Sequence, residues 1–279
     1  MHFLSHIRRA RSAVSARALV PNGWRLVAAL ALAATHGAVM AQASPPPTSS
    51  WLGGEGDWTA ANWSRDGQQP LAFTDAPRID RQAVIGALAP GQVTLNQSVR
   101  ILGAEIAHGS SLTLGASGQL INLAPARLEV DGSLGIGQAS TVNKRWMLSN
   151  DLTLAGAGTT RLAGQGTVVY AQNNHYRLTI EAGHTLTGTG SLGSRGVGGL
   201  MVTNRGRIDV AERGGLAVSG DLDNQGSMLV RSRLELQGGT ELRQTGGAVS
   251  CCCSARSMAG YSSRAARFAA AAWSTASWC

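Results

Sequence analysis

Cysteine is missing from the first 250 residues of this 279-residue chain, and aromatic residues make up only 5% of it. All four cysteines lie at the C-terminal end: Cys251, Cys252, Cys253 and Cys279. A chain that lacks cysteine over most of its length cannot depend on a disulfide framework. The three adjacent cysteines also lack the C-x₂-C spacing of zinc sites and have no histidine nearby. We therefore expect neither a disulfide-stapled fold nor a metal or redox site.

Acidic residues are few, 16 against 24 basic residues, so the formal net charge is +8. Five of the arginines, however, lie before residue 44, and three more follow Gly247. The 16 basic residues between these two ends are balanced by the 16 acidic ones, so residues 44–247 are neutral as a group. Because there is no basic patch in this stretch, we do not expect it to bind nucleic acid.

The N-terminal residues carry an export signal. Residues 1–25 contain arginines and no acidic side chain, and the apolar run "LVAALALAA" follows from Leu26 to Ala34. Small residues ending in "AQA" at positions 41–43 complete the pattern of a secretory signal peptide. The apolar run is about half as long as an anchored transmembrane helix needs, which makes a membrane anchor the weaker alternative. We expect residues 1–43 to be removed, and residues 44–50, "SPPPTSS", to form an extended, exposed spacer.

From about Val93 onward the chain consists of short alternating segments separated by Gly or Asn, such as "SLTLG", "DLTLAG", "RLTIEAG" and "RLELQGG". Alternation of apolar and polar residues between Gly-rich turns is typical of β-strands. No long segment has the period of an amphipathic helix. The sequence therefore predicts an all-β protein.

A repeat of twenty residues indicates which all-β architecture this is. Shifting residues 204–226 onto 224–246 aligns several identical pairs: Asn204 with Asn224, Gly206 with Gly226, Val210 with Val230, Arg213 with Arg233, Leu216 with Leu236, and Leu222 with Leu242. One such unit cannot bury its own apolar side chains, but stacked units can. We predict a right-handed, single-stranded parallel β-helix over residues 93–247, with seven or eight coils of three short strands. An antiparallel β-sandwich is the alternative.

The predicted inward positions are apolar side chains of the last two repeats. They are Leu216, Val218, Leu222, Leu236 and Leu242.

The segment before these coils, residues 51–92, begins with the Trp-rich stretch "SWLGGEGDWTAANWSRDG", Ser50 to Gly67. The three closely spaced tryptophans of this stretch can cap the first coil and cover its strand edges. Stacking of a carbohydrate on the indole rings is the alternative role. We expect residues 51–92 to be the N-terminal cap of the β-helix.

The same stretch resembles the opening of autotransporter passengers and related large surface adhesins of Gram-negative bacteria. There, W-x-G-G-x-G-x-W and A-N-W introduce "V-T-L…L-T-L-G" coils. The matching positions here are Trp51, Gly53, Gly54, Gly56, Trp58, Ala61, Asn62 and Trp63. The resemblance covers roughly residues 44–247. It implies a secreted or cell-surface passenger, a host-surface protein or glycan as partner, and an outer-membrane β-barrel translocator for which this chain has no room.

The C-terminal segment, residues 248–279, breaks the pattern. The next repeat should place residues like Ile208 and Val210 at positions 248 and 250, but these are Ala248 and Ser250. Only one of the 24 basic residues is a lysine, Lys144, which suggests GC-rich codons that read as Ala, Arg, Ser and Cys when out of frame. We interpret residues 248–279 as an aberrant tail from a shifted reading frame, disordered or at most a marginal helix around residues 264–273. The chain would then be truncated and remain in the periplasm.

Other motifs favour structural roles. "GTGSLG", Gly188–Gly193, fits G-x-G-x-x-G but has no following helix, so we interpret it as a glycine-rich corner. Asp221 and Asp223 could be the paired carboxylates of a β-helix enzyme, but their setting, "SGDLDNQG", favours solvated turn residues. His108, His175 and His184 are scattered.

The sequence therefore predicts no catalytic residues, no cofactor and no metal ion. We expect a non-enzymatic, adhesin-like passenger fragment. A secreted β-helix polysaccharide lyase or glycoside hydrolase is the alternative.

Overall fold

The computed structural model describes residues 45–66, 76–122, 124–137, 144–173, 176–194, 200–237 and 240–251, together with the backbone of residues 268–270. The predicted signal peptide, residues 1–43, lies outside the described residues. No helix in the described ranges could span a membrane.

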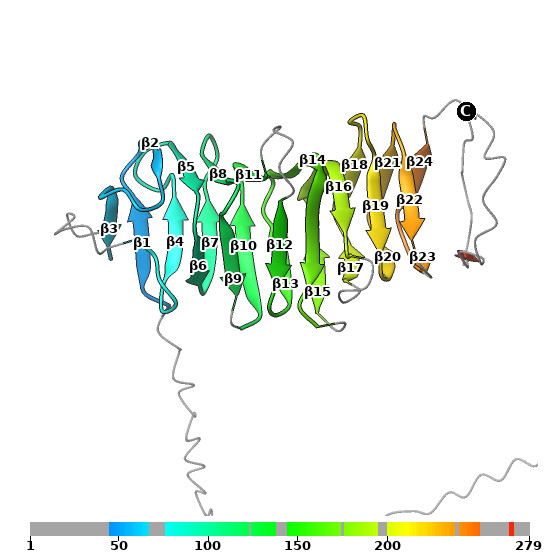
Figure 1. Cartoon of the computed structure of the whole chain (residues 1–279), viewed down its shortest axis with the longest axis horizontal. Coiled ribbons are helices and arrows are strands. Elements are labelled where there is room, and N and C mark those ends of the chain that lie inside the picture. The colour runs from blue at the N-terminus through cyan, green and yellow to red at the C-terminus, as the bar shows by residue number, and fades with distance from the viewer. Residues whose placement is uncertain are drawn as a thin grey trace, which may run out of the picture. The chain divides into compact units, whose positions relative to one another are not determined.

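The strands wind into a parallel β-solenoid of about 7 turns, and a full turn has strand residues on each of three faces, with some strands spanning two of them. In Figure 1 the strands of successive turns follow one another along the horizontal axis. This confirms the all-β class, the solenoid and the three strands per turn that the repeat predicts, and it excludes the antiparallel sandwich.

Face A is the sheet that contains β1 and its successors, which pair in parallel. Its strands are β1 (Thr48–Trp51), β4 (Gln82–Ile85), β7 (Gly103–Ile106), β10 (Ala126–Val130), β13 (Leu152–Ala155), β15 (Arg177–Ile180), β17 (Met201–Asn204), β20 (Leu222–Asn224), β23 (Leu242–Gln244) and β25 (Phe268–Ala270). At its N-terminal edge β3 (Trp63–Arg65) pairs antiparallel with β1.

Face B follows face A in each turn. Its strands are β2 (Gly54–Asp57), β5 (Gly91–Leu95), β8 (Ser111–Leu114), β11 (Ser133–Ile136), β14 (Thr159–Ala171), β16 (Thr185–Leu192), β18 (Arg207–Val210), β21 (Ser227–Val230) and β24 (Ala248–Cys251).

Face C completes the turn. It consists of β6 (Ser98–Ile101), β9 (Gln119–Asn122), β12 (Arg145–Leu148), the second halves of β14 and β16, β19 (Leu216–Ser219) and β22 (Leu234–Gln237). Strands β14 and β16 bend from face B onto face C, because Thr159–Leu162 of β14 pairs with β11 whereas Val168–Ala171 pairs with β12.

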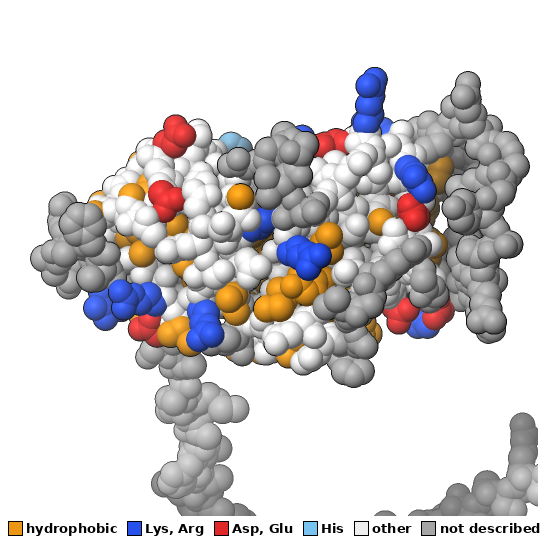
Figure 2. Space-filling view, in the orientation of Figure 1, with side chains coloured by type: hydrophobic (Ala, Val, Ile, Leu, Met, Phe, Trp, Pro, Cys, Tyr) orange, Lys and Arg blue, Asp and Glu red, His pale blue; other side chains and the backbone are white. Residues whose placement is uncertain are grey.

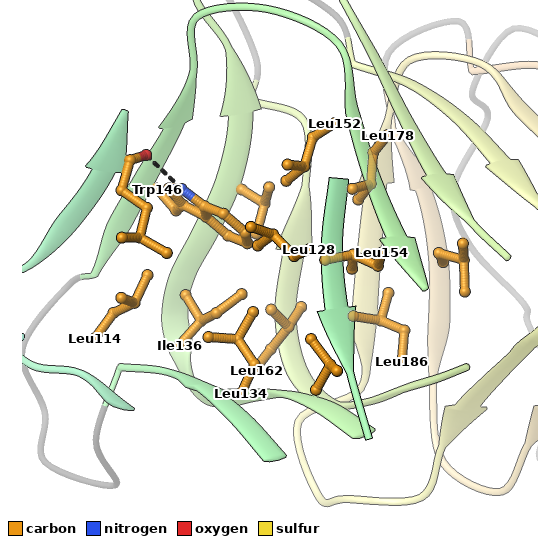
Figure 3. Close-up of a cluster of buried hydrophobic side chains, with 14 of the residues drawn as sticks. Leu114, Leu128, Leu134, Ile136, Trp146, Leu152, Leu154, Leu162, Leu178 and Leu186 are labelled. Atoms are coloured by element: carbon orange, nitrogen blue, oxygen red, sulfur yellow. Dashed lines mark hydrogen bonds between the residues drawn. The ribbon is translucent and has the colours of Figure 1, made fainter. Parts of the chain in front are cut away.

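In each strand, every second residue points its side chain inward. These inward side chains are mostly apolar and together form the core. Figure 3 shows these side chains converging from all three faces. On face A, Leu128 pairs with Leu154 and Leu154 with Ile180, all at most 2% exposed. The Trp146 ring lies among them, and its Nε1 donates a hydrogen bond to the Leu120 carbonyl oxygen at 2.9 Å (Figure 3). The inward side chains of the separate strands therefore form a continuous core only because the turns stack in parallel.

Turn length varies, which corrects part of the predicted register. Leu222 pairs with Leu242, as predicted, but Leu128 pairs with Leu154, so the earlier turn is longer than the predicted repeat. On face C, Leu216 pairs with Leu234 and not with the predicted Leu236. The corner before β22 (231–233) is two residues shorter than the corner before β19 (211–215), and the corner after β22 is two residues longer.

A shift of two keeps every side chain on its side of the strand. Of the five predicted inward residues, Leu216, Val218, Leu222 and Leu242 are buried and Leu236 is half-buried.

The three tryptophans of the opening cap the first turn. Trp51, Trp58 and Trp63 are at most 1% exposed, with the Trp63 ring centroid 5.2 Å from that of Trp51 and 4.9 Å from that of Trp58. Rings buried this completely offer no face to a sugar, so the carbohydrate-stacking alternative is wrong. The solenoid also begins earlier than predicted, because β1 includes Thr48–Ser50 of the predicted spacer and β4 lies within the predicted cap.

At the other end, the strand pattern continues four residues past Gly247. Strand β24 pairs with β21, with Val249 beside Met228 and Cys251 beside Val230. The shift from β21 to β24 is therefore one residue longer than the predicted twenty-residue repeat. The reason is that the corner at 245–247 has one residue more than the corner at 225–226. Residues 268–270, within the predicted marginal helix, form a strand beside β23. Cys252, Cys253 and Cys279 lie outside the described residues.

A buried row of amides joins the last three turns on face A. Asn204 Nδ2 donates to Asn224 Oδ1 at 2.5 Å, and Asn224 Nδ2 donates to Gln244 Oε1 at 2.8 Å. Asn204 and Asn224 are 0% exposed. The row explains why asparagine recurs in the repeat: a buried amide needs partners, and the same residue one turn away supplies them.

Replacing Asn224 by Ala should therefore lower the free energy of unfolding by about 2–4 kcal/mol, since it removes the acceptor of one buried N–H of Asn204 and the donor to Gln244. Urea unfolding of the full chain measures the loss. Gln225→Ala, at the exposed neighbouring position, is the control and should cost no more than about 1 kcal/mol, since its hydrogen bonds to Asp223 and Arg205 are exposed to water. Equal losses in the two variants would contradict the role of the amide row.

Candidate binding surface

Because side chains alternate along a strand, every second side chain of each face points away from the core and forms the outer surface. On face B two outward rows are rich in hydroxyl groups. One row contains Ser111, Ser133, Thr159 and Thr185, and the other contains Thr94, Thr113 and Thr187. Parallel register brings these side chains together from strands that are far apart in the sequence.

A shallow hollow of about 480 Å³ lies beside these rows, at the corner between faces A and B. It exists because the corner of one turn has only two residues, Asp131 and Gly132, whereas the corners on either side, 107–110 and 156–158, are longer. The exposed ring of His108 and the hydroxyl groups of Ser111 and Ser133 line it. One oxygen of Asp131 accepts a hydrogen bond from the Ala157 backbone N–H at 2.8 Å, so this carboxylate is partly committed to the fold.

Face C has a different outer surface, in which apolar side chains occupy outward positions. Leu120, Trp146, Leu148 and Val169 point into the core, so alternation turns their neighbours outward. The outward side chains form the face C patch: Arg100, Ile121, Arg145, Met147, Val168 and Tyr170. The four apolar members are half-buried, and the two arginines are exposed.

Strand pairing fixes the order of the patch. Arg100 pairs with Ile121 across β6 and β9, and Met147 pairs with Tyr170 across β12 and β14. Strands β9 and β12 are joined by Trp146, and by Gln119 Nε2, which donates to the Arg145 carbonyl oxygen at 3.2 Å. The row Arg100, Ile121, Met147, Tyr170 therefore runs across four consecutive strands. Figure 2 shows, at mid-length on the face in view, hydrophobic side chains gathered next to Lys and Arg side chains.

The charges of face C are unbalanced, in contrast to those of the other faces. Among the described residues, no carboxylate lies within 4.0 Å of the charged nitrogens of Arg100 or Arg145. The strands of face C from β6 to β19 contain no Asp or Glu. On face B, by contrast, Asp209 accepts hydrogen bonds from both Arg207 and Arg231 at 2.7–2.8 Å.

The face C patch was not predicted from the sequence. Its signal is present in the segments "QLIN", "RWML" and "VVYA", where apolar residues occupy both the inward and the outward positions of a strand. Only the register shows that Ile121, Met147 and Tyr170 are neighbours.

The two predicted carboxylates lie on the outer side of face A. Asp221 is exposed at the start of β20, and Asp223 is half-buried within that strand. Asp223 Oδ1 accepts a hydrogen bond from Thr245 Oγ1 at 2.6 Å and Oδ2 accepts one from Gln225 Nε2 at 2.8 Å. Asp223 is therefore a strand residue held by its neighbours and not the turn residue that the sequence predicts.

The glycine-rich motif is a corner, as predicted. Gly188 and Gly190 lie inside β16, where the strand bends from face B to face C, and Gly193 follows its end. Gly193 has φ +83°, and a Cβ there would lie 1.7 Å from the Ser219 carbonyl oxygen. Close packing of successive turns therefore explains the glycine at this position.

Two titratable side chains are buried at corners of the solenoid. His184 is 0% exposed, and its Nε2 lies 2.9 Å from Thr160 Oγ1. Burial lowers the pKa of His184 below its ordinary value of 6.5, although the nearby backbone of Gly156 and Ala155 and the charge of Glu129 oppose this. Lys144, just before β12, is 2% exposed, and burial lowers its pKa to about 8. His108 is exposed, and His175 lies outside the described residues.

Within the described ranges, no group of three or more His, Cys, Asp or Glu side chains is arranged to hold a metal ion. Comparison of the chain with protein-family models, with curated proteins and with solved structures found no match. The candidate site therefore depends on the geometry of this chain alone.

The buried imidazole of His184 predicts a pH dependence of stability. Below about pH 6.5 the unfolded histidine binds a proton, whereas the buried ring with its lowered pKa resists protonation. The contribution of His184 is therefore complete above that pH and is lost as the pH falls toward its folded pKa. Between about pH 7 and pH 5, His184→Gln should reduce the slope of unfolding free energy against pH, as measured by urea titration. A slope that stays unchanged in His184→Gln would contradict the prediction.

Proposed function

We propose that this chain is a non-enzymatic binding module of an adhesin-like secreted passenger, and that the face C patch is its binding surface. A solenoid repeats one outward position at a constant spacing, about 4.7–4.9 Å per turn. Such a row suits a ligand that extends along the stack of turns.

The observation that carries the proposal is the composition of the patch. An aromatic ring, a methionine, two β-branched apolar side chains and two arginines lie together on a face that has no carboxylate in its strands from β6 to β19. Tyr, Met and Arg are the residues enriched where proteins bind partners, because they combine large contact area with hydrogen-bonding or charge.

The proposal is tested by adding charge to the patch. Met147→Glu with Tyr170→Glu should reduce binding of the full chain to cell-surface glycans and matrix proteins by about tenfold or more, since these paired residues are its largest apolar side chains. Binding is measured on an immobilised panel of these molecules, after circular dichroism has confirmed the fold of each variant.

The matched control is Thr153→Glu with Thr179→Glu on face A. These threonines also lie opposite each other on paired strands, and both are half-buried and outward. The control adds the same charge and the same repulsion between neighbours, so binding should stay within about twofold. Equal loss in both variants, or loss in neither, would contradict the face C assignment.

The alternative of a polysaccharide lyase or hydrolase is tested through the two carboxylates of β20. We expect Asp221→Asn with Asp223→Asn to leave binding unchanged and to lower stability by no more than about 1–2 kcal/mol, from the hydrogen bonds at Asp223. Chromatography of bound glycans after incubation should show them intact. Glycan cleavage that disappears in this double variant would establish the enzyme and overturn the proposal.

A further inference from the structure

We infer that the ligand of the face C patch is an acidic polysaccharide, sulfated or carboxylated, that lies along the stack across β6, β9, β12 and β14. The inference rests on the proposed binding function and adds the chemical class of the ligand.

The first argument is charge complementarity. Several other arginines of the solenoid are paired with carboxylates, as Arg127 is with Glu129, Arg161 with Glu212, and Arg231 with Asp209, at 2.7–2.8 Å. Arg100 and Arg145 instead lie on the outer side of face C, in strands that contain no Asp or Glu. Neither has a carboxylate partner among the described residues. A guanidinium group offers a planar fork of N–H donors that fits a carboxylate or sulfate oxygen pair.

The second argument is the spacing of the patch. Arg100 and Arg145 are separated by two steps of the stack, about 10 Å along its axis, and by two residue positions, about 7 Å, along the strands. One step is close to the length of one sugar unit in an extended chain, so two steps correspond to one disaccharide. The two arginines therefore suit a polymer that carries an acidic group on every second sugar.

The third argument is the apolar row that continues from Arg100 and runs beside Arg145. Ile121, Met147 and Tyr170 place one side chain on each of three neighbouring strands. The C–H face of a sugar ring packs against an aromatic ring and against the flat sides of Met and Ile, while its hydroxyl groups stay in water.

An acidic peptide fits the patch less well. Extended peptides are commonly recognised by addition to a free sheet edge, where backbone groups are unpaired. The patch lies on the outer side of face C, where β6 pairs with β9 and β12 pairs with β14, while side chains of Trp146 and Gln119 bridge β9 and β12. A ligand on this outer side therefore meets mainly side chains.

The test measures binding of the full chain to four probes: heparin, hyaluronan, neutral dextran and polyglutamate. We expect heparin or hyaluronan to bind, with an affinity that falls as salt is raised, and dextran and polyglutamate to bind at least about tenfold more weakly. Comparing heparin with hyaluronan distinguishes sulfate from carboxylate. Arg100→Gln with Arg145→Gln should weaken binding by about tenfold for each arginine.

The matched control removes the same charge from face A. Arg127→Gln with Arg243→Gln replaces two arginines whose side chains are 58% and 57% exposed, and binding should stay within about twofold. Tyr170→Phe should keep the affinity because the ring face remains, whereas Tyr170→Ala should lose about tenfold.

Several results would overturn the inference. Equal weakening by the face A control would show unspecific charge attraction, and tighter binding of polyglutamate would identify an acidic protein segment as the ligand. If the full chain binds its panel through Met147 and Tyr170 but binds no acidic polysaccharide, the proposed function stands and the ligand class is wrong. If it binds neither the panel nor the four probes, both fail.

Discussion

In-register stacking of inward apolar side chains is the interaction on which the rest of this structure depends. A single turn exposes its Leu, Ile and Val side chains, and only the turns above and below remove them from water. Leu128, Leu154 and Ile180 contribute to one such column because parallel pairing sets them opposite one another. Strand pairing and core formation are therefore the same event, and neither can change without the other.

Differences in length between turns are found mainly at the corners, because the strands must stay in register for their inward side chains to stack. Turns differ in length by several residues, yet the inward positions stay aligned because insertions are confined to the corners. The hollow at Asp131 and the bend of β16 at Gly188 both lie at such corners. The N-terminal end follows the same logic: no described turn precedes the first, and Trp51, Trp58 and Trp63 close this end of the core.

Because the inward positions are committed to packing, the outward positions are those that can differ between faces. Face A and face B use them for ion pairs and hydroxyl groups, as at Asp209 and Thr187. Face C uses them for Met147, Tyr170 and two arginines. The buried amides of Asn204 and Asn224 show how a polar side chain in the core can take its partner from the next turn.

The sequence by itself determined the fold class, the twenty-residue step of the last turns and the cap, because these follow from alternation, from the recurrence of Asn204 at Asn224, and from three clustered tryptophans. It did not determine which turns are longer, where β24 ends or that Leu216 meets Leu234, since corner length is set by how adjacent turns fit and not by any local pattern. The face C patch belongs to this second group. Ile121, Met147 and Tyr170 are far apart in the chain, and each alone is an ordinary strand residue. Only the register of the stacked turns makes them one surface, because a shift of a single residue in any strand would turn its member into the core.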